Sequence, residues 1–170
     1  MSILKDSGER RQFYDAEGNP MAVRDMAEGK GRCDLLPLDV ISELLKREYA
    51  YVDILSLISN FMVTKDENYL YKAILKFGQI RYKNTPDMIL ELAKQYEDGC
   101  KKYGERNWEK GIPLHCFIDS GVRHYLKWLR GDEDEPHDRG FVWNIAGAIW
   151  ILKHRPECID LWSDDNDKKV

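Results

Sequence analysis

The sequence predicts an all-α fold, a bundle of about five helices in a single domain. Apolar residues recur three and four positions apart over most of the chain, the periodicity of helices that bury one face. Proline and glycine stand at positions typical of helix starts and ends, and no segment shows a convincing strand-like alternation. At 170 residues the chain is long enough to bury a sizeable core.

Composition divides the chain into three parts. Residues 1–28 are polar and dotted with glycine, with a turn-like AEGNP segment, so we expect an extended, poorly structured arm. Residues 29–155 are expected to form one helical domain that carries an inserted helical segment near residues 48–85. Residues 156–170 are expected to form a polar tail.

The first helix is predicted for residues 38–62, with a break expected near Tyr49. Pro37 stands near the helix start, where its missing N–H costs nothing, and Asp39 favours the first turn. The periodic apolar positions at the beginning of this helix are Val40, Ile41, Leu44 and Leu45.

The remaining helices follow one another along the chain. Residues 64–82 place their apolar side chains on one helical face. Thr85 is followed by proline and starts a helix that Gly104 ends, and Pro113 opens another helix that Gly131 closes. The last segment, RGFVWNIAGAIWILKH, is apolar almost all round, which predicts a buried helix.

Net charge, hydropathy and cysteine spacing argue against several classes of protein. The net charge of -4 argues against duplex nucleic acid as a partner, because binding to its phosphates needs concentrated positive charge. No apolar run approaches the roughly 20 residues of a membrane span, and the N-terminal stretch lacks the apolar core of an export signal. The four cysteines form no CxxC pair, so we expect reduced structural thiols rather than zinc ligands.

Polar residues in the last two predicted helices are candidates for chemistry. Asp119 and Arg123 stand four apart and can pair, with His124 in a neighbouring row of the same helix. Asn144 lies among small residues on the buried helix, where its amide must find partners. An exposed ion pair and a structural histidine are the alternative explanation for the first three residues.

The loop between these helices, DEDEPHD, concentrates carboxylates beside a histidine. Asp134, His137 and Asp138 could hold Mg²⁺ or Mn²⁺ at the helix entrance, and Glu97, on the helix that starts at Thr85, is a further candidate. Carboxylates from different helices commonly build such sites in bundles. A solvated acidic turn is the alternative.

A second cluster, in KKYGERNWEKG, combines cations with aromatic rings and an amide. Such a set suits the phosphates and base of a nucleotide, although Trp108 could equally plug the end of the bundle. Glycine-rich phosphate loops are absent, and no cysteine has an evident histidine partner by spacing. The cluster consists of Lys101, Lys102, Tyr103, Arg106, Asn107, Trp108 and Lys110.

Four segments, GKGRCDLLPLDVI, YEDGCKKYGERNWEKGIP, DSGVRHYLKWLRGDEDEPH and WNIAGAIW, resemble the phage family of dATP/dGTP diphosphohydrolase N-terminal domains. The resemblance covers roughly residues 29–47 and 92–152. It implies an all-α, MazG-like fold and a homo-oligomer acting in the cytoplasm of a bacterial host. The implied activity is metal-dependent release of pyrophosphate from a purine deoxynucleoside triphosphate, with Mg²⁺ or Mn²⁺ as cofactor.

The resemblance also implies roles for individual residues. Two departures stand out: Glu97 is followed three positions later by Cys100 instead of a second acid, and His137 by Gly140 instead of a second histidine. These departures favour, as an alternative, a non-catalytic protein that binds or sequesters a nucleotide. The implied catalytic residues are Glu97, Asp119 and His124; the metal ligands are Glu97, Asp134, His137 and Asp138; the substrate-binding residues are Lys101, Lys102, Tyr103, Arg106, Asn107, Trp108, Arg123 and Asn144.

Overall fold

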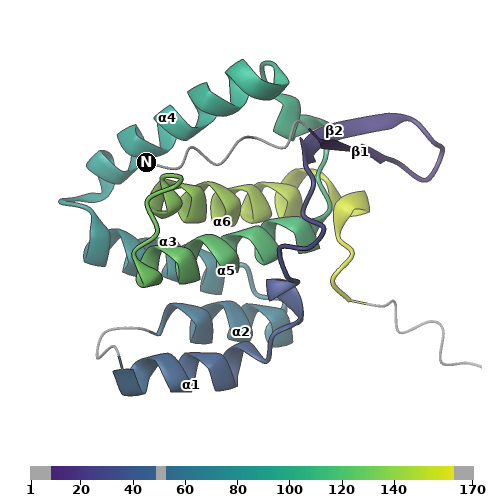
Figure 1. Cartoon of the computed structure of the whole chain (residues 1–170). Helices are drawn as coiled ribbons and strands as arrows, with labels where there is room; N and C mark the ends of the chain where they lie inside the picture. The colour runs from purple at the N-terminus through teal and green to yellow at the C-terminus, as the bar shows by residue number, and fades with distance from the viewer. Residues whose placement is uncertain (1–8, 49–52, 163–170) are drawn as a thin grey trace, which may run out of the picture.

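The computed structural model describes residues 9–48 and 53–162. Within this part of the chain six α-helices accompany one small two-stranded sheet, which confirms the predicted all-α class (Figure 1). The elements are β1 (Arg10–Tyr14), β2 (Pro20–Asp25), η1 (Cys33–Leu35), α1 (Leu38–Glu48), α2 (Ile54–Thr64), α3 (Asn68–Arg81), α4 (Thr85–Tyr103), η2 (Asn107–Lys110), α5 (Leu114–Arg130), α6 (His137–His154) and η3 (Pro156–Cys158), where η denotes a 3₁₀ turn.

The helices α5 and α6 form the centre of the bundle. The helix α6 buries residues on all sides, as its sequence predicts, and it lies between α3, α4 and α5 (Figure 1). A Cβ atom at Gly147 would lie 2.3 Å from a ring carbon of Phe117, so only glycine allows this close approach. Beside this contact, Phe77, Tyr125 and Phe141 pack their rings together in the core.

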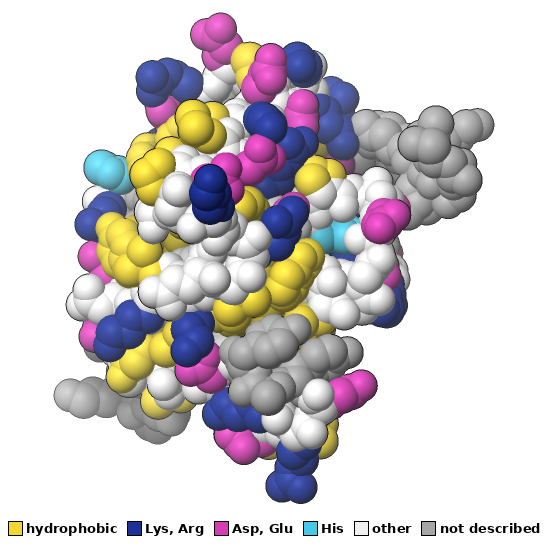
Figure 2. Space-filling view, turned by 90° about the vertical axis from the view of Figure 1, so that its left-hand side faces the viewer, with side chains coloured by type: hydrophobic (Ala, Val, Ile, Leu, Met, Phe, Trp, Pro, Cys, Tyr) yellow, Lys and Arg dark blue, Asp and Glu magenta, His cyan; other side chains and the backbone are white. Residues whose placement is uncertain are grey.

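The helix predicted for residues 38–62 is two helices, α1 and α2, which accounts for a sixth helix where about five were expected. The expected break at Tyr49 lies outside the described residues. The helices α1 and α2 form a separate layer on the far side of the bundle from α4 (Figure 1). Figure 2 shows a face of the molecule on which apolar side chains are exposed in patches among charges of both signs.

The structure differs from the expected extended arm at the N-terminus. Residues 10–25 form an antiparallel hairpin, with an irregularity in register between Gln12 and Tyr14 that obscures any alternation in the sequence. Phe13, Met21 and Ala22 are buried, and the Ala22 N–H donates to the Gly111 carbonyl at 3.0 Å. Packing against a distant part of the chain therefore stabilises this hairpin.

The described end of the chain packs back on the bundle. Cys158 is buried, and the Trp162 indole N–H donates to the Met62 carbonyl at 2.8 Å. All four cysteines are free thiols. In residues 9–48 and 53–162, the helices are too short or too polar to cross a membrane.

Candidate functional site

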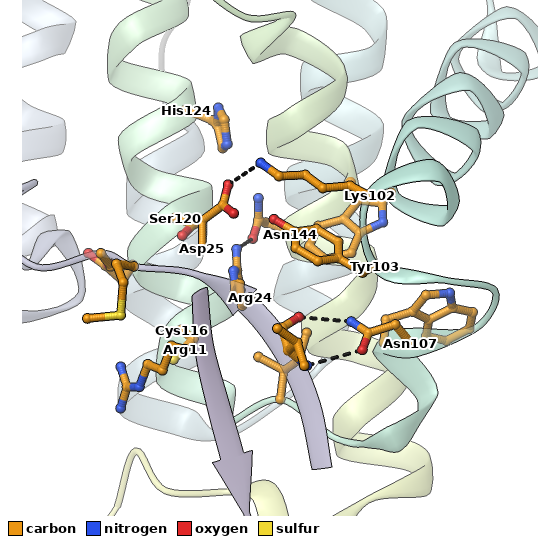
Figure 3. A pocket seen from close by; sticks show the side chains of 18 of the residues that line it. Arg11, Arg24, Asp25, Lys102, Tyr103, Asn107, Cys116, Ser120, His124 and Asn144 are labelled. Carbon is orange, nitrogen blue, oxygen red and sulfur yellow. Dashed lines mark hydrogen bonds and ion pairs between the residues drawn. The ribbon is translucent and has the colours of Figure 1, made fainter. Parts of the chain in front are cut away.

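A cleft of about 2080 Å³ lies between the N-terminal hairpin and the helical bundle (Figure 3). The strand β2 and the loop after it form one wall, and the end of α4 with η2 forms another. The floor comes from α5 and α6. The cleft therefore joins the arm region to the segments in which the sequence places its candidate residues.

Asn107 holds the hairpin wall in place. Its amide oxygen accepts the Val23 N–H at 3.1 Å, and its amide N–H donates to the Val23 carbonyl at 2.9 Å (Figure 3). Asn107 is buried and bonds β2 as a neighbouring strand would. The amide that the sequence assigns to substrate lines the cleft, but these bonds commit it to the backbone of β2.

The pair formed by Asp119 and Arg123 holds the loop that follows β2. Their side chains are 2.5 Å apart, and Asp119 is buried rather than exposed. Asp119 also accepts the Cys33 N–H at 2.6 Å, while Arg123 donates to the Gly31 carbonyl at 2.6 Å. Both residues line the cleft, and their hydrogen bonds give them a positioning role in its wall.

Only part of the basic and aromatic cluster faces the cleft. Lys102 pairs with Asp25 of β2 at 2.6 Å (Figure 3), and burial raises the pKa of the neighbouring Tyr103 to about 12. Lys101 is exposed outside the cleft lining and pairs with Glu97 at 3.4 Å. Arg106 lies at the cleft rim and pairs with Glu109 at 2.5 Å.

Trp108 packs within an aromatic group along the cleft. Its ring centroid lies 5.5 Å from that of Tyr96 and 4.9 Å from that of Trp150, both in edge-on geometry. The ring thus packs against the core, as the plug interpretation expects, and it also lines the cleft, as the nucleotide interpretation expects.

Two histidines meet where α5 passes the start of α6. The Nδ1 atoms of His124 and His137 are 2.9 Å apart, and His137 Nε2 lies 2.7 Å from Asp134 Oδ1. Burial, together with the charge that His137 can carry, lowers the pKa of His124 to about 3. His124 is therefore neutral near pH 7, the form in which histidine binds metal ions.

Gly140 explains how this pair forms without a second histidine on α6. A Cβ atom at Gly140 would lie 2.9 Å from His124 Nδ1. The His124 ring, which comes from α5, therefore fills the space that a side chain at position 140 would need. Two helices supply the histidine pair that the family resemblance leads one to expect on one helix.

The histidine pair and the acidic loop can hold a divalent metal. Ligand atoms of His124, Glu135 and His137 lie within 4.8 Å of one another, as do those of Asp132, Asp134 and His137. The set mixes imidazole nitrogen with carboxylate oxygen, whereas Mg²⁺ prefers oxygen ligands alone, so these residues suit a transition-metal ion better than Mg²⁺.

Two predicted metal ligands lie elsewhere. Asp138 lies in the first turn of α6, outside the cleft lining, and pairs with Arg81 at 2.9 Å. The Glu97 side chain is 65% exposed on α4 and also lies outside the cleft lining. The structure therefore unites Asp134 and His137 with His124, but not with Glu97 or Asp138.

Arg24 of β2 is a cleft residue that the sequence did not suggest. Its guanidinium carbon lies 5.3 Å from the Phe117 ring centroid and 5.6 Å from that of Trp143. Its Nη2 donates to Asn144 Oδ1 at 2.6 Å, and the Asn144 amide in turn donates to the Gly140 carbonyl at 2.8 Å. Asn144 thus has the buried partners its position required. The sequence around Arg24 carried no signal, because the arm appeared unstructured.

A cysteine with a histidine partner also lines the cleft, which corrects the expectation drawn from spacing. Cys116 Sγ lies 3.4 Å from His115 Nε2, and His115 Nδ1 lies 2.5 Å from Asp160 Oδ2. The hydrogen bond to Asp160 raises the pKa of His115 to about 10. His115 and Cys116 are neighbours in the sequence, so this pair could be read from it, whereas Asp160 lies 45 residues after His115, too far for a spacing rule to connect.

Comparison with known proteins bears on this site. The family model described as dATP/dGTP diphosphohydrolase, N-terminal, matches residues 69–160, more than half of the chain. No curated protein and no solved structure matches the chain. The matched residues include the histidine pair and the aromatic group, whereas the hairpin wall lies before them.

Proposed function

Because the chain belongs to the dATP/dGTP diphosphohydrolase N-terminal family, we propose that it is a Mn²⁺-dependent pyrophosphohydrolase of purine deoxynucleoside triphosphates. The observation that carries the proposal is the contact of His124 with His137, and of His137 with Asp134, beside a cleft lined by cations and aromatic rings. A metal site adjoining such a cleft suits a triphosphate whose charge must be neutralised and whose base can stack.

The proposed reaction adds water to the α-phosphorus and breaks its bond to the oxygen that leads to the β-phosphate. The products are a deoxynucleoside monophosphate and pyrophosphate. His137 would hold the metal together with either His124 and Glu135 or Asp132 and Asp134, and the bound metal would neutralise phosphate charge and make water a better nucleophile.

Other residues of the chain bind and position the substrate in this proposal. Lys127 lies 3.5 Å from Asp134, so its ammonium is close to the metal-binding loop and to any phosphate held there. Trp108 and Trp143 present ring surface to the cleft on which a purine base can stack. Asp119 and Arg123 keep the loop at 30–33 in place and so help to shape the cleft.

The second candidate function is binding of a nucleotide without hydrolysis. It is favoured by the position of Glu97, whose carboxylate faces solvent on α4 instead of joining the histidine pair. Fewer carboxylates at the metal leave fewer groups able to accept a proton from water. A protein of this kind would sequester its nucleotide intact.

Incubation of the full chain with dATP, dGTP, dCTP or dTTP tests both functions. We expect pyrophosphate and monophosphate from the purine substrates with Mn²⁺, less with Mg²⁺, and none with a chelator. His137→Ala should lower the rate at least about tenfold, as loss of a metal-site residue does. His154→Ala, at an exposed histidine outside the cleft lining, is the matched control.

The products decide between the outcomes. Tight binding of intact nucleotide with no pyrophosphate would favour sequestration over hydrolysis. Release of inorganic phosphate in place of pyrophosphate would refute the proposed bond cleavage. Failure to bind any nucleotide would refute both functions.

A further inference from the structure

Arg24 is placed in the middle of the cleft by the hairpin. Figure 3 shows its side chain beside Asn144, to which it is hydrogen-bonded, among residues from both walls of the cleft. The rings of Phe117 and Trp143 lie at cation–π distances from its guanidinium. These contacts help to hold the guanidinium in place between the hairpin and the bundle.

The hydrogen bonds of Arg24 are incomplete. Lys102, Arg123 and Lys127 line the same cleft, and each pairs with a carboxylate. By contrast, the acceptor for Arg24 is the neutral amide oxygen of Asn144. Its Nη1 atom is fully buried and has no hydrogen-bond partner among the described residues.

Burying the Arg24 guanidinium without a carboxylate partner costs free energy. Burial disfavours the charged guanidinium and lowers the pKa of Arg24. A buried N–H donor without an acceptor costs additional free energy, because water can no longer satisfy it. An anion in the cleft with acceptor oxygens would remove both penalties at once.

The contacts along α6 place Arg24 near the proposed metal ligands. Asn144, which holds the guanidinium, bonds to the Gly140 carbonyl one turn earlier. Gly140 is the residue against which the His124 ring packs. One helical turn corresponds to about 5–6 Å along the axis, less than the length of a triphosphate. A phosphate chain bound at the histidine pair can therefore reach the guanidinium.

We propose that Arg24 binds the phosphate chain of the nucleotide, and that Asn144 is the positioning residue that orients it. This inference rests on the proposed nucleotide site but does not require that the nucleotide be hydrolysed. The N-terminal hairpin then becomes part of the binding site. The planar guanidinium suits this role because it can donate two parallel hydrogen bonds to one phosphate.

Binding measurements with three ligands test the proposal in the presence of Mn²⁺. The ligands are α,β-methylene-dATP, inorganic tripolyphosphate and deoxyadenosine. Arg24→Gln should lower the affinity for the two phosphate ligands about tenfold to a hundredfold, because it removes charge-assisted hydrogen bonds. The affinity for deoxyadenosine should stay within about twofold of that of wild type. Arg47→Gln removes the same charge at an exposed position on α1 and should change none of the three affinities.

Arg24→Lys keeps the charge and guards against misfolding of the glutamine variant. It should fold as wild type does and bind tripolyphosphate with intermediate affinity, because a lysine cannot make the paired hydrogen bonds. Thermal melting of each variant checks the fold. Unchanged tripolyphosphate affinity in both variants would overturn the proposal, as would an equal loss for deoxyadenosine.

The hydrolysis assay separates this inference from the proposed function. Pyrophosphate release by wild type with no binding defect in Arg24→Gln would overturn the inference and leave the function standing. Phosphate binding that depends on Arg24, without pyrophosphate release, would support the inference and refute the proposed hydrolysis. A wild-type protein that binds none of the phosphate ligands would overturn the inference.

Discussion

The amide of Asn107 offers a direct test of how the hairpin wall is held. Replacing Asn107 with alanine removes two hydrogen bonds to Val23 and leaves the N–H and carbonyl of that residue without their partner. Because the asparagine is buried, water does not readily replace its amide. We therefore expect the change to loosen β2 without altering the helices.

The expected loss follows from the two bonds. Each buried hydrogen bond contributes about 0.5–1.5 kcal/mol, so Asn107→Ala should lower the free energy of unfolding by about 1–3 kcal/mol. A loss of 1 kcal/mol lowers the melting temperature of a chain of this size by about 2–4 °C. Asn60→Ala, at an exposed position on α2, is the matched control and should change the melting temperature by far less.

Two measurements check the reasoning. Urea denaturation gives the free energy of unfolding, and hydrogen exchange of the Ala22 and Val23 amides reports local opening of β2. Exchange should be faster in Asn107→Ala, and nucleotide affinity should fall because β2 carries Arg24. A variant with wild-type exchange at these amides and wild-type stability would refute the view that Asn107 holds the hairpin.

Three further predictions concern α5 and α6. Gly147→Ala would bring a Cβ atom to 2.3 Å from Phe117, so the free energy of unfolding should fall by about 1–3 kcal/mol; an unchanged melting curve would contradict this packing. Gly140→Ala should displace the His124 ring and weaken Mn²⁺ binding about tenfold, and calorimetry showing wild-type affinity would argue against His124 as a ligand. The raised pKa of His115, about 10, means that its pairing with Asp160 stabilises the fold fully below pH 6.5 and loses this effect as pH rises towards 10. The stability difference between wild type and His115→Gln should therefore shrink over that range, and a constant difference would contradict the charged pair.

The helices could be predicted where local signals define them. Pro86 and Gly104 bound α4, and the apolar pattern of α6 shows that it is buried. The hairpin could not be predicted, because Asn107 holds Val23 across 84 residues of sequence. Local sequence patterns do not reveal a contact between residues so far apart in the chain.

Some residues of the candidate site could likewise be grouped from the sequence, and others could not. His137 and Asp134 stand three apart in one loop and helix start, so the sequence could group them. Periodicity alone does not say which face of α4 meets the cleft, so the sequence groups Glu97 with residues that it does not approach. Arg24 reaches the cleft through tertiary packing, which no spacing rule describes.

The hairpin has a practical consequence for any attempt to produce the domain in isolation. A fragment cut at the family match, residues 69–160, would keep the histidine pair and lose the strand that covers the cleft. The rings of Phe117 and Trp143 and the buried amide of Asn107 would then meet water without their partners. Such a fragment should be prone to aggregation and bind nucleotide poorly. Expression boundaries for this domain belong upstream of Arg10, not at the edge of the matched region.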